Sequence, residues 1–255
     1  MEELLYQMIF KRKSFHLFRD TGTKKIFPAE IKKIEEKFPS FQPLIKDIKI
    51  DFKIVPAVKT TCQRGEEYCI LLYSEQKNNY LENIGYIGEQ LDLYLTSLNI
   101  GTLWFGIGKT EEINYGDLKF VIMIAIKKVD ENKFRKDMFK SKRKPLEEIC
   151  LGSDHLNILK IARFAPSSCN TQPWLVETKK DKLTIFRYKK PGKRGIMPAN
   201  KVTFYNRIDI GIFLLFIELC LKHEKIEYNK TLITNNDSDD NEKTLIAVYD
   251  LKENL

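Results

Sequence analysis

The sequence is poor in the residues that build metal centres and disulfide frameworks. It has three histidines, none at ligand spacing from another histidine or from a cysteine, so the sequence predicts no metal site. The five cysteines are odd in number, widely separated and without a CxxC pair. They predict no disulfide framework and fit a reducing compartment.

A long apolar run is also missing. The longest one, residues 210–221, is interrupted by Glu218 and is too short to span a bilayer. Residues 1–13 begin with acidic side chains and have the pattern of an amphipathic helix, unlike a signal peptide. We therefore expect a cytoplasmic protein with no membrane partner.

The positive charge of the chain is not concentrated anywhere. Lys and Arg outnumber Asp and Glu by 43 to 35, for a net charge of +8, but they are scattered along the whole length. Dispersed charge favours solubility and mild attraction to anions. No RGG tract, RNP-type aromatic signature or zinc-finger spacing accompanies it, so we expect no nucleic-acid partner.

Three common signatures of nucleotide binding and hydrolysis are absent. Residues 106–110 end like a P-loop, but Leu103 stands where that motif needs its first glycine. No GxGxxG follows a first strand, so a nicotinamide would not bind to a Rossmann domain. No GxSxG elbow marks a hydrolase.

What the sequence does contain is an alternation of helical and extended patterns. In the first half, periodicity predicts a helix at the start of the chain and another opened by Pro28. Strands follow from Ile50 and Tyr68, then a long helix through residues 84–98, then a buried strand from Phe120.

After a charged connector the order begins again. Ser153 is the predicted N-cap of a helix over residues 155–164. A strand over 183–188, a helix over 210–222 and a last strand over 244–251 follow, with a polar loop at residues 234–243. The helix over 210–222 has almost no polar face, so it must be buried. The predicted fold class is α+β, with a mixed, mostly antiparallel sheet flanked by helices.

The two passes match in register, which suggests a duplicated unit divided into residues 1–135 and 136–255. The matching pairs and their offsets are Arg12-Lys13 with Arg143-Lys144 (143 − 12 = 131), Gln42-Pro43 with Gln172-Pro173 (172 − 42 = 130), and Gly88 with Gly211 (211 − 88 = 123). The alternative is two unrelated α+β halves that share short dipeptides by chance.

The sharpest local signal is the decapeptide APSSCNTQPW at residues 165–174, directly after a predicted helix. Its small hydroxyls and its amide can hydrogen-bond the polar edge of a ring at close range. Trp174 supplies a large apolar anchor. From composition alone, an ordinary helix-terminating loop would explain the same residues.

This decapeptide resembles the APSSxNxQPW signature of the FMN-dependent nitroreductases. Three other segments agree. Residues 12–15 with Phe18 resemble the family's RRSxRxF motif, although His16 and Leu17 depart from it. Residues 101–106 resemble its GTCWIG turn, and residues 143–148 resemble its RKPLEE segment.

The order of these segments departs from that of an ordinary member, in which the APSS block precedes the GTCWIG turn. Ordinary members are homodimers that hold each FMN between two subunits. The rearranged order resembles the subgroup of single-chain pseudo-dimers. It implies two pseudo-symmetric halves fused in one chain, sharing one interface, with a monomer as the working unit.

The resemblance also implies roles for particular residues. Arg12, Lys13, Ser14 and Arg143 would bind the FMN phosphate and ribityl end. The remaining contacts would surround the isoalloxazine ring: Pro166, Ser167, Ser168 and Asn170 from the decapeptide, and Trp104, Phe105 and Gly106 from the turn, with the Gly106 N–H near flavin N5. No side chain is assigned a catalytic role. The alternatives are a solvated basic helix end for Arg12 and Lys13, and core packing for Trp104.

A second, symmetry-related site would be damaged. Its phosphate segment would have Pro145 in place of the Ser14 hydroxyl, and its ring-facing loop would be residues 39–43. That loop has lost the Asn and one Ser and has gained Phe41, which could fill the vacant pocket.

The activity that the resemblance implies is hydride transfer from NAD(P)H, through FMN, to nitroaromatic, quinone or similar small acceptors, in a ping-pong sequence. Another flavin reaction, such as dehalogenation or flavin breakdown, and a non-enzymatic flavin-binding or sensing role remain as alternatives.

Overall fold

The computed structural model describes residues 1–189, 194–233 and 242–252. They form two compact units, which we describe separately. The N-terminal unit is Gln7–Met138, and the C-terminal unit combines Met1–Tyr6 with Phe139–Leu255. Within the described residues, no helix has both the length and the apolarity needed to cross a bilayer.

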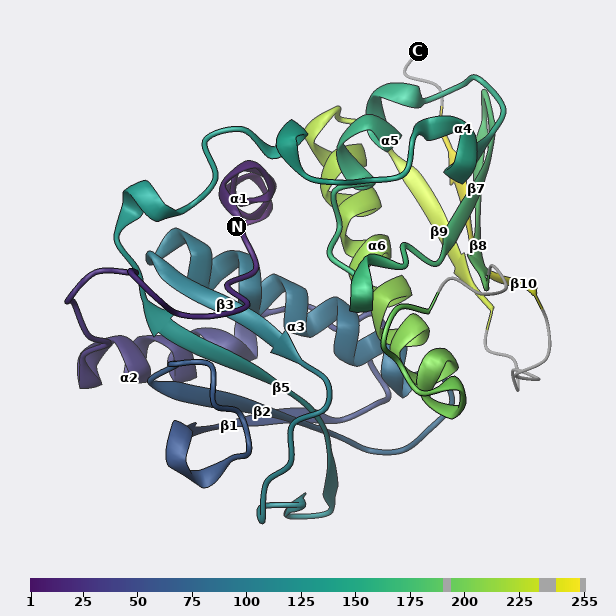
Figure 1. Cartoon of the computed structure of the whole chain (residues 1–255). Helices are drawn as coiled ribbons and strands as arrows, with labels where there is room; N and C mark the ends of the chain where they lie inside the picture. The colour runs from purple at the N-terminus through teal and green to yellow at the C-terminus, as the bar shows by residue number, and fades with distance from the viewer. Residues whose placement is uncertain (190–193, 234–241, 253–255) are drawn as a thin grey trace. The chain divides into compact units, whose positions relative to one another are not determined.

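The N-terminal unit is a five-stranded antiparallel sheet with helices. The strands lie in the order β1-β2-β5-β3, and β4 pairs with β5. In chain order its elements are α1 (Glu2–Lys11, which begins in the C-terminal unit), α2 (Pro28–Lys37), β1 (Ile50–Pro56), β2 (Tyr68–Ser74), α3 (Tyr80–Ser97), β3 (Ile100–Phe105), β4 (Asn114–Tyr115) and β5 (Leu118–Lys128) (Figure 1).

The central strand of this sheet is formed by an apolar run of residues. The run from Val121 to Ile126 on β5 is buried, and β5 pairs with both β2 and β3. Helix α3 packs close to one sheet face at Gly88. A Cβ built on Gly88 would lie 2.5 Å from Cη2 of Trp104 and 3.0 Å from Cδ1 of Leu72. The glycine therefore allows the helix to approach the sheet closely.

The C-terminal unit has a five-stranded sheet in the order β6-β7-β8-β10-β9. All of its pairs are antiparallel except the short parallel pair β6–β7. Its elements are α4 (Leu146–Ile149), β6 (Cys150–Leu151), α5 (Leu156–Ala162), β7 (Trp174–Lys179), β8 (Lys182–Tyr188), α6 (Val202–His223), β9 (Tyr228–Leu232) and β10 (Lys243–Leu251).

The two sheets share one connectivity. In each unit a hairpin of two strands leads into a long helix, and two further strands follow. The last strand of each unit inserts between the hairpin and the first strand after the long helix, which gives β1-β2-β5-β3 in one unit and β7-β8-β10-β9 in the other. The N-terminal unit adds β4 at β5, and the C-terminal unit adds β6 at β7.

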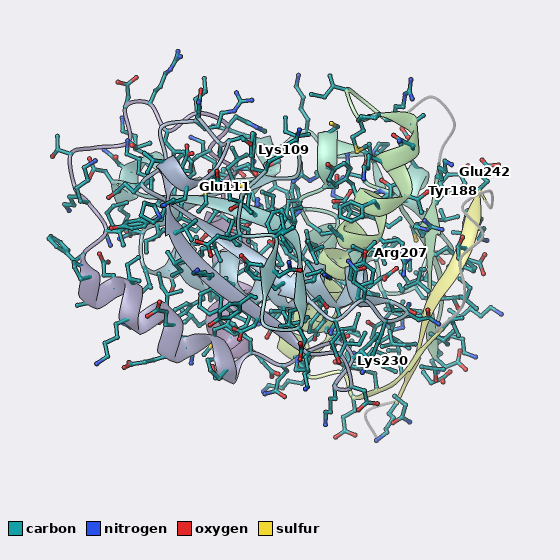
Figure 2. The ribbon with its side chains drawn as sticks, turned by 90° about the horizontal axis from the view of Figure 1, so that it is seen from below. Lys109, Glu111, Tyr188, Arg207, Lys230 and Glu242 are labelled. Carbon is teal, nitrogen blue, oxygen red and sulfur yellow. The ribbon has the colours of Figure 1, made fainter. Side chains whose placement is uncertain are left out.

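Helix α6 is buried along most of its length, as its uniformly apolar sequence predicts. Its one buried acid near the C-terminal end, Glu218, accepts hydrogen bonds from Tyr228 (3.1 Å), Lys230 (2.9 Å) and Tyr249 (2.9 Å). Figure 2 labels Lys230, on β9. The strands thus compensate the only charge in this stretch of the helix.

The structure confirms the predicted α+β class with mostly antiparallel sheets. Two local predictions were wrong, and one strand was missed. Ser153 does not cap α5, because the cap is His155 in the left-handed region (φ 54°). Residues 101–105, predicted as a turn, form β3 because they pair with β5. Trp174 begins strand β7, which the sequence did not indicate. Most of the polar loop predicted at 234–243 lies outside the described residues.

Candidate functional site

Two of the predicted site segments meet within the N-terminal unit. Ser14 forms an isolated parallel bridge with Thr102 on β3, and the Phe15 N–H donates to the Thr102 carbonyl at 3.0 Å. Gly101 makes room for this contact, because a Cβ there would lie 2.8 Å from the Phe15 ring. The Arg-Lys-Ser segment is therefore fixed along the strand that carries Trp104 and Phe105.

A buried polar network lies beneath these segments. The Arg12 guanidinium pairs with Asp92 at 2.8 Å and with Glu89 at 3.1 Å, and it donates to Ser14 Oγ at 3.3 Å. Thr102 Oγ1 donates to Asp92 at 2.6 Å. Trp104 Nε1 lies 3.0 Å from Asp92 and 3.2 Å from Glu89. Both carboxylate side chains are 0% exposed.

Burial sets the charge state of this network. Burial by itself would lower the pKa of Arg12, but Asp92 and Glu89 raise that pKa above its usual value, so the guanidinium stays charged. Burial raises the pKa of Glu89 well above its usual range although Arg12 opposes the shift. We therefore expect Glu89 to hold a proton, with Asp92 as the ionic partner of Arg12.

The remaining predicted residues of this unit lie nearer the surface. Lys13 is half-buried, and its Nζ lies 3.1 Å from the Lys133 carbonyl and 5.0 Å from the centre of the Phe15 ring. Phe105 is the half-buried last residue of β3, and Gly106 follows it in a turn. The chain thus leaves the sheet at Gly106, whose backbone N–H was predicted to lie near flavin N5.

In the C-terminal unit, the decapeptide forms a tight loop with unusual backbone angles. Cys169, Asn170 and Gln172 have φ values of 50°, 55° and 49°. The left-handed region costs a non-glycine residue roughly 1–3 kcal/mol, and such strain collects at functional sites. Surrounding contacts must therefore hold this loop in place.

Asp209 on α6 supplies the first of these contacts. Its Oδ1 accepts hydrogen bonds from the Ser168 N–H (3.0 Å) and the Ser168 hydroxyl (3.2 Å), whereas its buried Oδ2 has no hydrogen-bond partner among the described residues. Burial, against the opposing effect of the Ser168 hydrogen bonds, raises the pKa of Asp209 to about 8. Asp209 therefore holds the loop as a carboxyl group that keeps its proton near neutral pH.

Further hydrogen bonds close the loop on itself and on the sheet. The Gln172 N–H donates to Ser167 Oγ at 2.9 Å. The Tyr188 N–H, at the end of β8, donates to the Pro173 carbonyl at 2.9 Å; Figure 2 labels Tyr188. Pro166 is buried, and Trp174 is fully buried against Phe213, with ring centroids 4.5 Å apart.

Arg143 joins this loop within the same unit. Its guanidinium donates to Asn170 Oδ1 at 3.2 Å and to the Phe164 carbonyl at 3.1 Å. The Asn170 amide in turn donates to the Lys142 carbonyl at 3.2 Å. Two segments that the sequence singled out separately are therefore linked by the side chains of Arg143 and Asn170.

The sequence matches one protein family over most of its length. A profile of the family described as "Putative TM nitroreductase" matches residues 4–221, a range that contains every site residue discussed above. The chain belongs to this nitroreductase family. It is accordingly a member of an oxidoreductase family, and flavin dependence is the general property of that family. None of the curated proteins matches the sequence.

Solved structures agree with this assignment at the level of the fold. A "putative nitroreductase" from Thermotoga maritima superimposes with a TM-score of 0.62, at 19% sequence identity, over 97% of this chain and 93% of that chain. At that identity the likeness shows the fold alone.

Two further structures resemble the nitroreductase-family chain more weakly. A "putative nitroreductase in complex with FMN" from Desulfovibrio desulfuricans has a TM-score of 0.41 at 20% identity, over 58% of this chain and 96% of that chain. A "putative NADH oxidase" from Clostridium acetobutylicum has a TM-score of 0.40 at 15% identity, over 57% of this chain and 99% of that chain. We base no argument on either.

Sequence reasoning missed three acids of the nitroreductase-family chain: Glu89, Asp92 and Asp209. All three are buried in long, mostly apolar helices. An acid on an otherwise buried helix face needs a partner, so each was visible in the sequence as an anomaly. The partners themselves, Arg12 and Ser168, are far away in the sequence and could not be assigned.

Proposed function

We propose that this nitroreductase-family protein binds one FMN per chain and transfers hydride from NAD(P)H to nitroaromatic, quinone or similar small acceptors. The observation that carries the proposal is the family match over residues 4–221, which contains both groups of residues that the structure fixes in place. FMN, when bound, supplies the hydride-transfer chemistry at its N5 position.

The donors present fit the phosphate of FMN. Lys13 is only half-buried, and Arg12 directs NH2 at the Ser14 hydroxyl (3.3 Å). Arg143 brings a second guanidinium beside the decapeptide loop. Guanidinium and ammonium groups with a neighbouring hydroxyl are the donors that phosphate oxygens prefer. We propose that Arg12, Lys13, Ser14 and Arg143 bind this end of the cofactor.

The strained loop fits the flavin ring. Its Ser168 hydroxyl is held by Asp209 and its Asn170 amide by Arg143, so these groups need little reorganisation when they meet a polar ring edge. We propose that Pro166, Ser167, Ser168 and Asn170 contact the ring. From β3 and its turn, Trp104 and Phe105 would border the ring, and the Gly106 N–H would donate to N5. No side chain is required as an acid or base.

A ping-pong sequence is the form of catalysis that we propose, with the oxidised nicotinamide leaving before the acceptor binds. The test begins with the absorbance spectrum of the freshly purified protein and an FMN titration. Anaerobic stopped-flow mixing with NADH and NADPH then follows flavin bleaching, and mixing with a nitroaromatic or quinone follows its recovery. Bound FMN that neither nicotinamide reduces would instead support a flavin-binding or sensing protein.

A further inference from the structure

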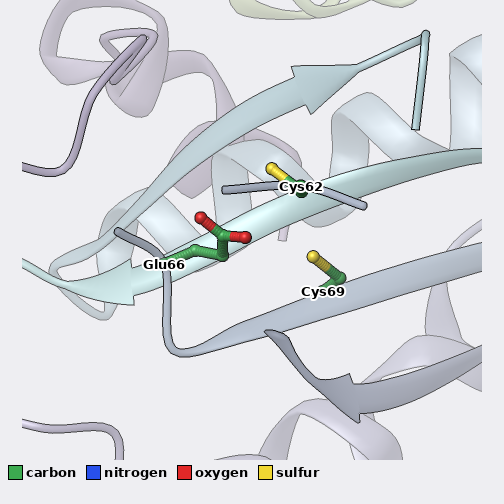
Figure 3. A group of neighbouring side chains, drawn as sticks. All are labelled: Cys62, Glu66 and Cys69. Carbon is green, nitrogen blue, oxygen red and sulfur yellow. The ribbon is translucent and has the colours of Figure 1, made fainter. Parts of the chain in front are cut away.

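Outside the residues discussed above, three potential ligands converge in the N-terminal unit. Cys69 lies on β2, and Cys62 and Glu66 lie on the segment between β1 and β2. Their sulfur and carboxylate ligand atoms all lie within 4.8 Å of one another. Figure 3 shows the three side chains gathered in one place, beside β2.

The burial of the two thiols and of one carboxylate oxygen makes this group unusual. Cys62 is 3% exposed, Cys69 is 0% exposed, and both are free thiols. Glu66 is anchored by one oxygen, Oε2, which accepts the Arg64 N–H at 2.8 Å. The other oxygen, Oε1, is shielded from solvent and accepts no hydrogen bond among the described residues. An unsatisfied buried carboxylate oxygen is costly.

Packing alone does not explain this arrangement. The two thiols belong to an apolar cluster that includes Leu71, Leu103 and Met123, where cysteines can serve as small hydrophobic side chains. A carboxylate directed at them loses solvation, and a thiol is only a weak hydrogen-bond donor to compensate that loss. A Cys62–Cys69 disulfide would leave Glu66 Oε1 unpaired, whereas a bound cation would satisfy the carboxylate and both sulfurs together.

We propose that Cys62, Glu66 and Cys69 form a binding site for a borderline or soft divalent cation, with Zn²⁺ as the reference ion. Zinc takes thiolates at about 2.3 Å and carboxylates at about 2.0–2.2 Å in tetrahedral geometry. Small movements of the side chains from their present separation satisfy these lengths. Binding exchanges the two thiol protons for one Zn²⁺, without oxidation or reduction.

The fourth position has two possible occupants, a water molecule and the hydroxyl of Thr60. Thr60 Oγ1 lies 3.4 Å from the Cys69 sulfur, and it accepts the Cys62 N–H at 3.2 Å while donating to the Ala57 carbonyl at 3.1 Å. With Thr60 as the fourth ligand the site would have the closed coordination of a structural centre. Zinc would fasten the segment between β1 and β2 to the sheet.

None of the three ligands is a proposed flavin residue, although Phe105 packs against the same apolar cluster, and the metal site does not rest on the proposed function. Cys69 and Leu103 lie in the apolar cluster on one side of the sheet. Trp104, the neighbour of Leu103 on β3, contacts Gly88 of α3 on the other side. We therefore expect the metal to change stability and thiol reactivity.

The experiment titrates the reduced full-length protein with Co²⁺ and then with Zn²⁺ under anaerobic conditions. We expect a thiolate-to-cobalt charge-transfer band that saturates at about one Co²⁺ per chain, is displaced by Zn²⁺, and accompanies a rise in Tm. The band should be lost in C62S and C69S and weakened in E66Q. C220S, which changes another buried thiol, should retain it.

A second measurement needs no variant. Zn²⁺ should protect Cys62 and Cys69 from alkylation, read peptide by peptide by mass spectrometry, while the exposed Cys169 stays reactive. Absence of a charge-transfer band in protein whose thiols are fully reduced overturns the proposal. So does a band that persists in the C62S and C69S variants, or a lack of protection of both cysteines.

Discussion

Individual residues show how the buried acids of this chain are compensated. Arg12 pairs with Asp92 and Glu89, and Asp209 accepts its hydrogen bonds from Ser168. In the first case a cation compensates the acid. In the second case a proton does, since burial raises the pKa of Asp209 to about 8.

The first prediction is a pH-dependent stability that Asp209 causes. The folded protein keeps this proton up to pH about 8, whereas an unfolded Asp loses it near pH ~3.9. Between these values the folded state binds more protons, so stability is highest at the acid end and falls as pH rises, by up to about 1.4 kcal/mol per pH unit. Above the folded pKa this contribution levels off.

Urea unfolding of wild type and D209N at pH 5, 6 and 7 measures the effect. Because Asn cannot ionise, D209N should gain relative to wild type at each step in pH. D117N, at an exposed position, is the control and should follow wild type. A difference between D209N and wild type that is the same at every pH would contradict the assignment.

A second prediction separates phosphate binding from folding. R12A leaves two buried acids without their cation and should cost roughly 3–5 kcal/mol of stability, so loss of FMN in that variant would say little about contact. K13A removes a half-buried charge and should leave stability within about 0.5 kcal/mol. Its FMN affinity should fall roughly tenfold or more, as expected for a charge-assisted hydrogen bond.

The matched control for K13A is K32A, since Lys32 is an exposed lysine on α2. FMN titration by fluorescence quenching and urea unfolding of all three variants give the two readouts. Wild-type FMN affinity in K13A would remove Lys13 from the proposed site.

At the scale of elements, the long helices α3 and α6 organise their units. Each carries acids that hold a predicted site segment, Asp92 for Thr102 and Asp209 for Ser168. The close approach of α3 to β3 at Gly88 sets the position of Trp104, whose indole reaches Asp92.

The third prediction tests that approach. An exposed Gly→Ala change in a helix usually stabilises a protein by about 1 kcal/mol. G88A should instead destabilise by roughly 1–3 kcal/mol, because its Cβ would lie 2.5 Å from Trp104 Cη2. A double-mutant cycle with W104L, followed by urea unfolding, should recover most of that cost. Additive effects would show that Trp104 does not limit the approach.

The same scale shows which predictions came from the sequence. The apolar run of β5, the long helices and strands β1, β2 and β8 were predictable, because their sequence patterns record which residues are buried. The start of α5 and the strand at residues 100–105 were not. The first depends on His155 adopting a left-handed conformation, and the second depends on pairing with β5.

At the scale of the whole molecule, the repeated connectivity supports the predicted duplication. In the loop at residues 39–43, predicted as the ring-facing loop of a damaged second site, one side chain joins the core while Pro39, Ser40 and Gln42 stay exposed. Phe41 is buried, with Phe38 at 6.1 Å and Tyr94 at 6.0 Å between ring centroids. Gln90 holds this loop through Gln42.

The fourth prediction is therefore one FMN per chain in a monomeric protein. Flavin released by denaturation, divided by protein concentration, gives the stoichiometry, and light scattering gives the mass in solution. F41A should remove buried apolar area without creating a second site, because the loop would still lack the Asn and the second Ser. Two flavins per wild-type chain, or a requirement for a dimer, would count against the pseudo-dimer proposal while leaving flavin binding open.

The sequence by itself determined the secondary structure with strong periodicity, the family, and the segments that carry its motifs. Those properties depend on residues that are close together in the sequence, as periodic patterns or as short motifs. Only the tertiary structure decided that Arg12 pairs with Asp92 and Glu89, that Asp209 holds Ser168, and that Cys62, Glu66 and Cys69 converge. Each of these depends on how separate segments pack. A buried charge shows that a partner is needed, and the packing of the chain decides which residue provides it.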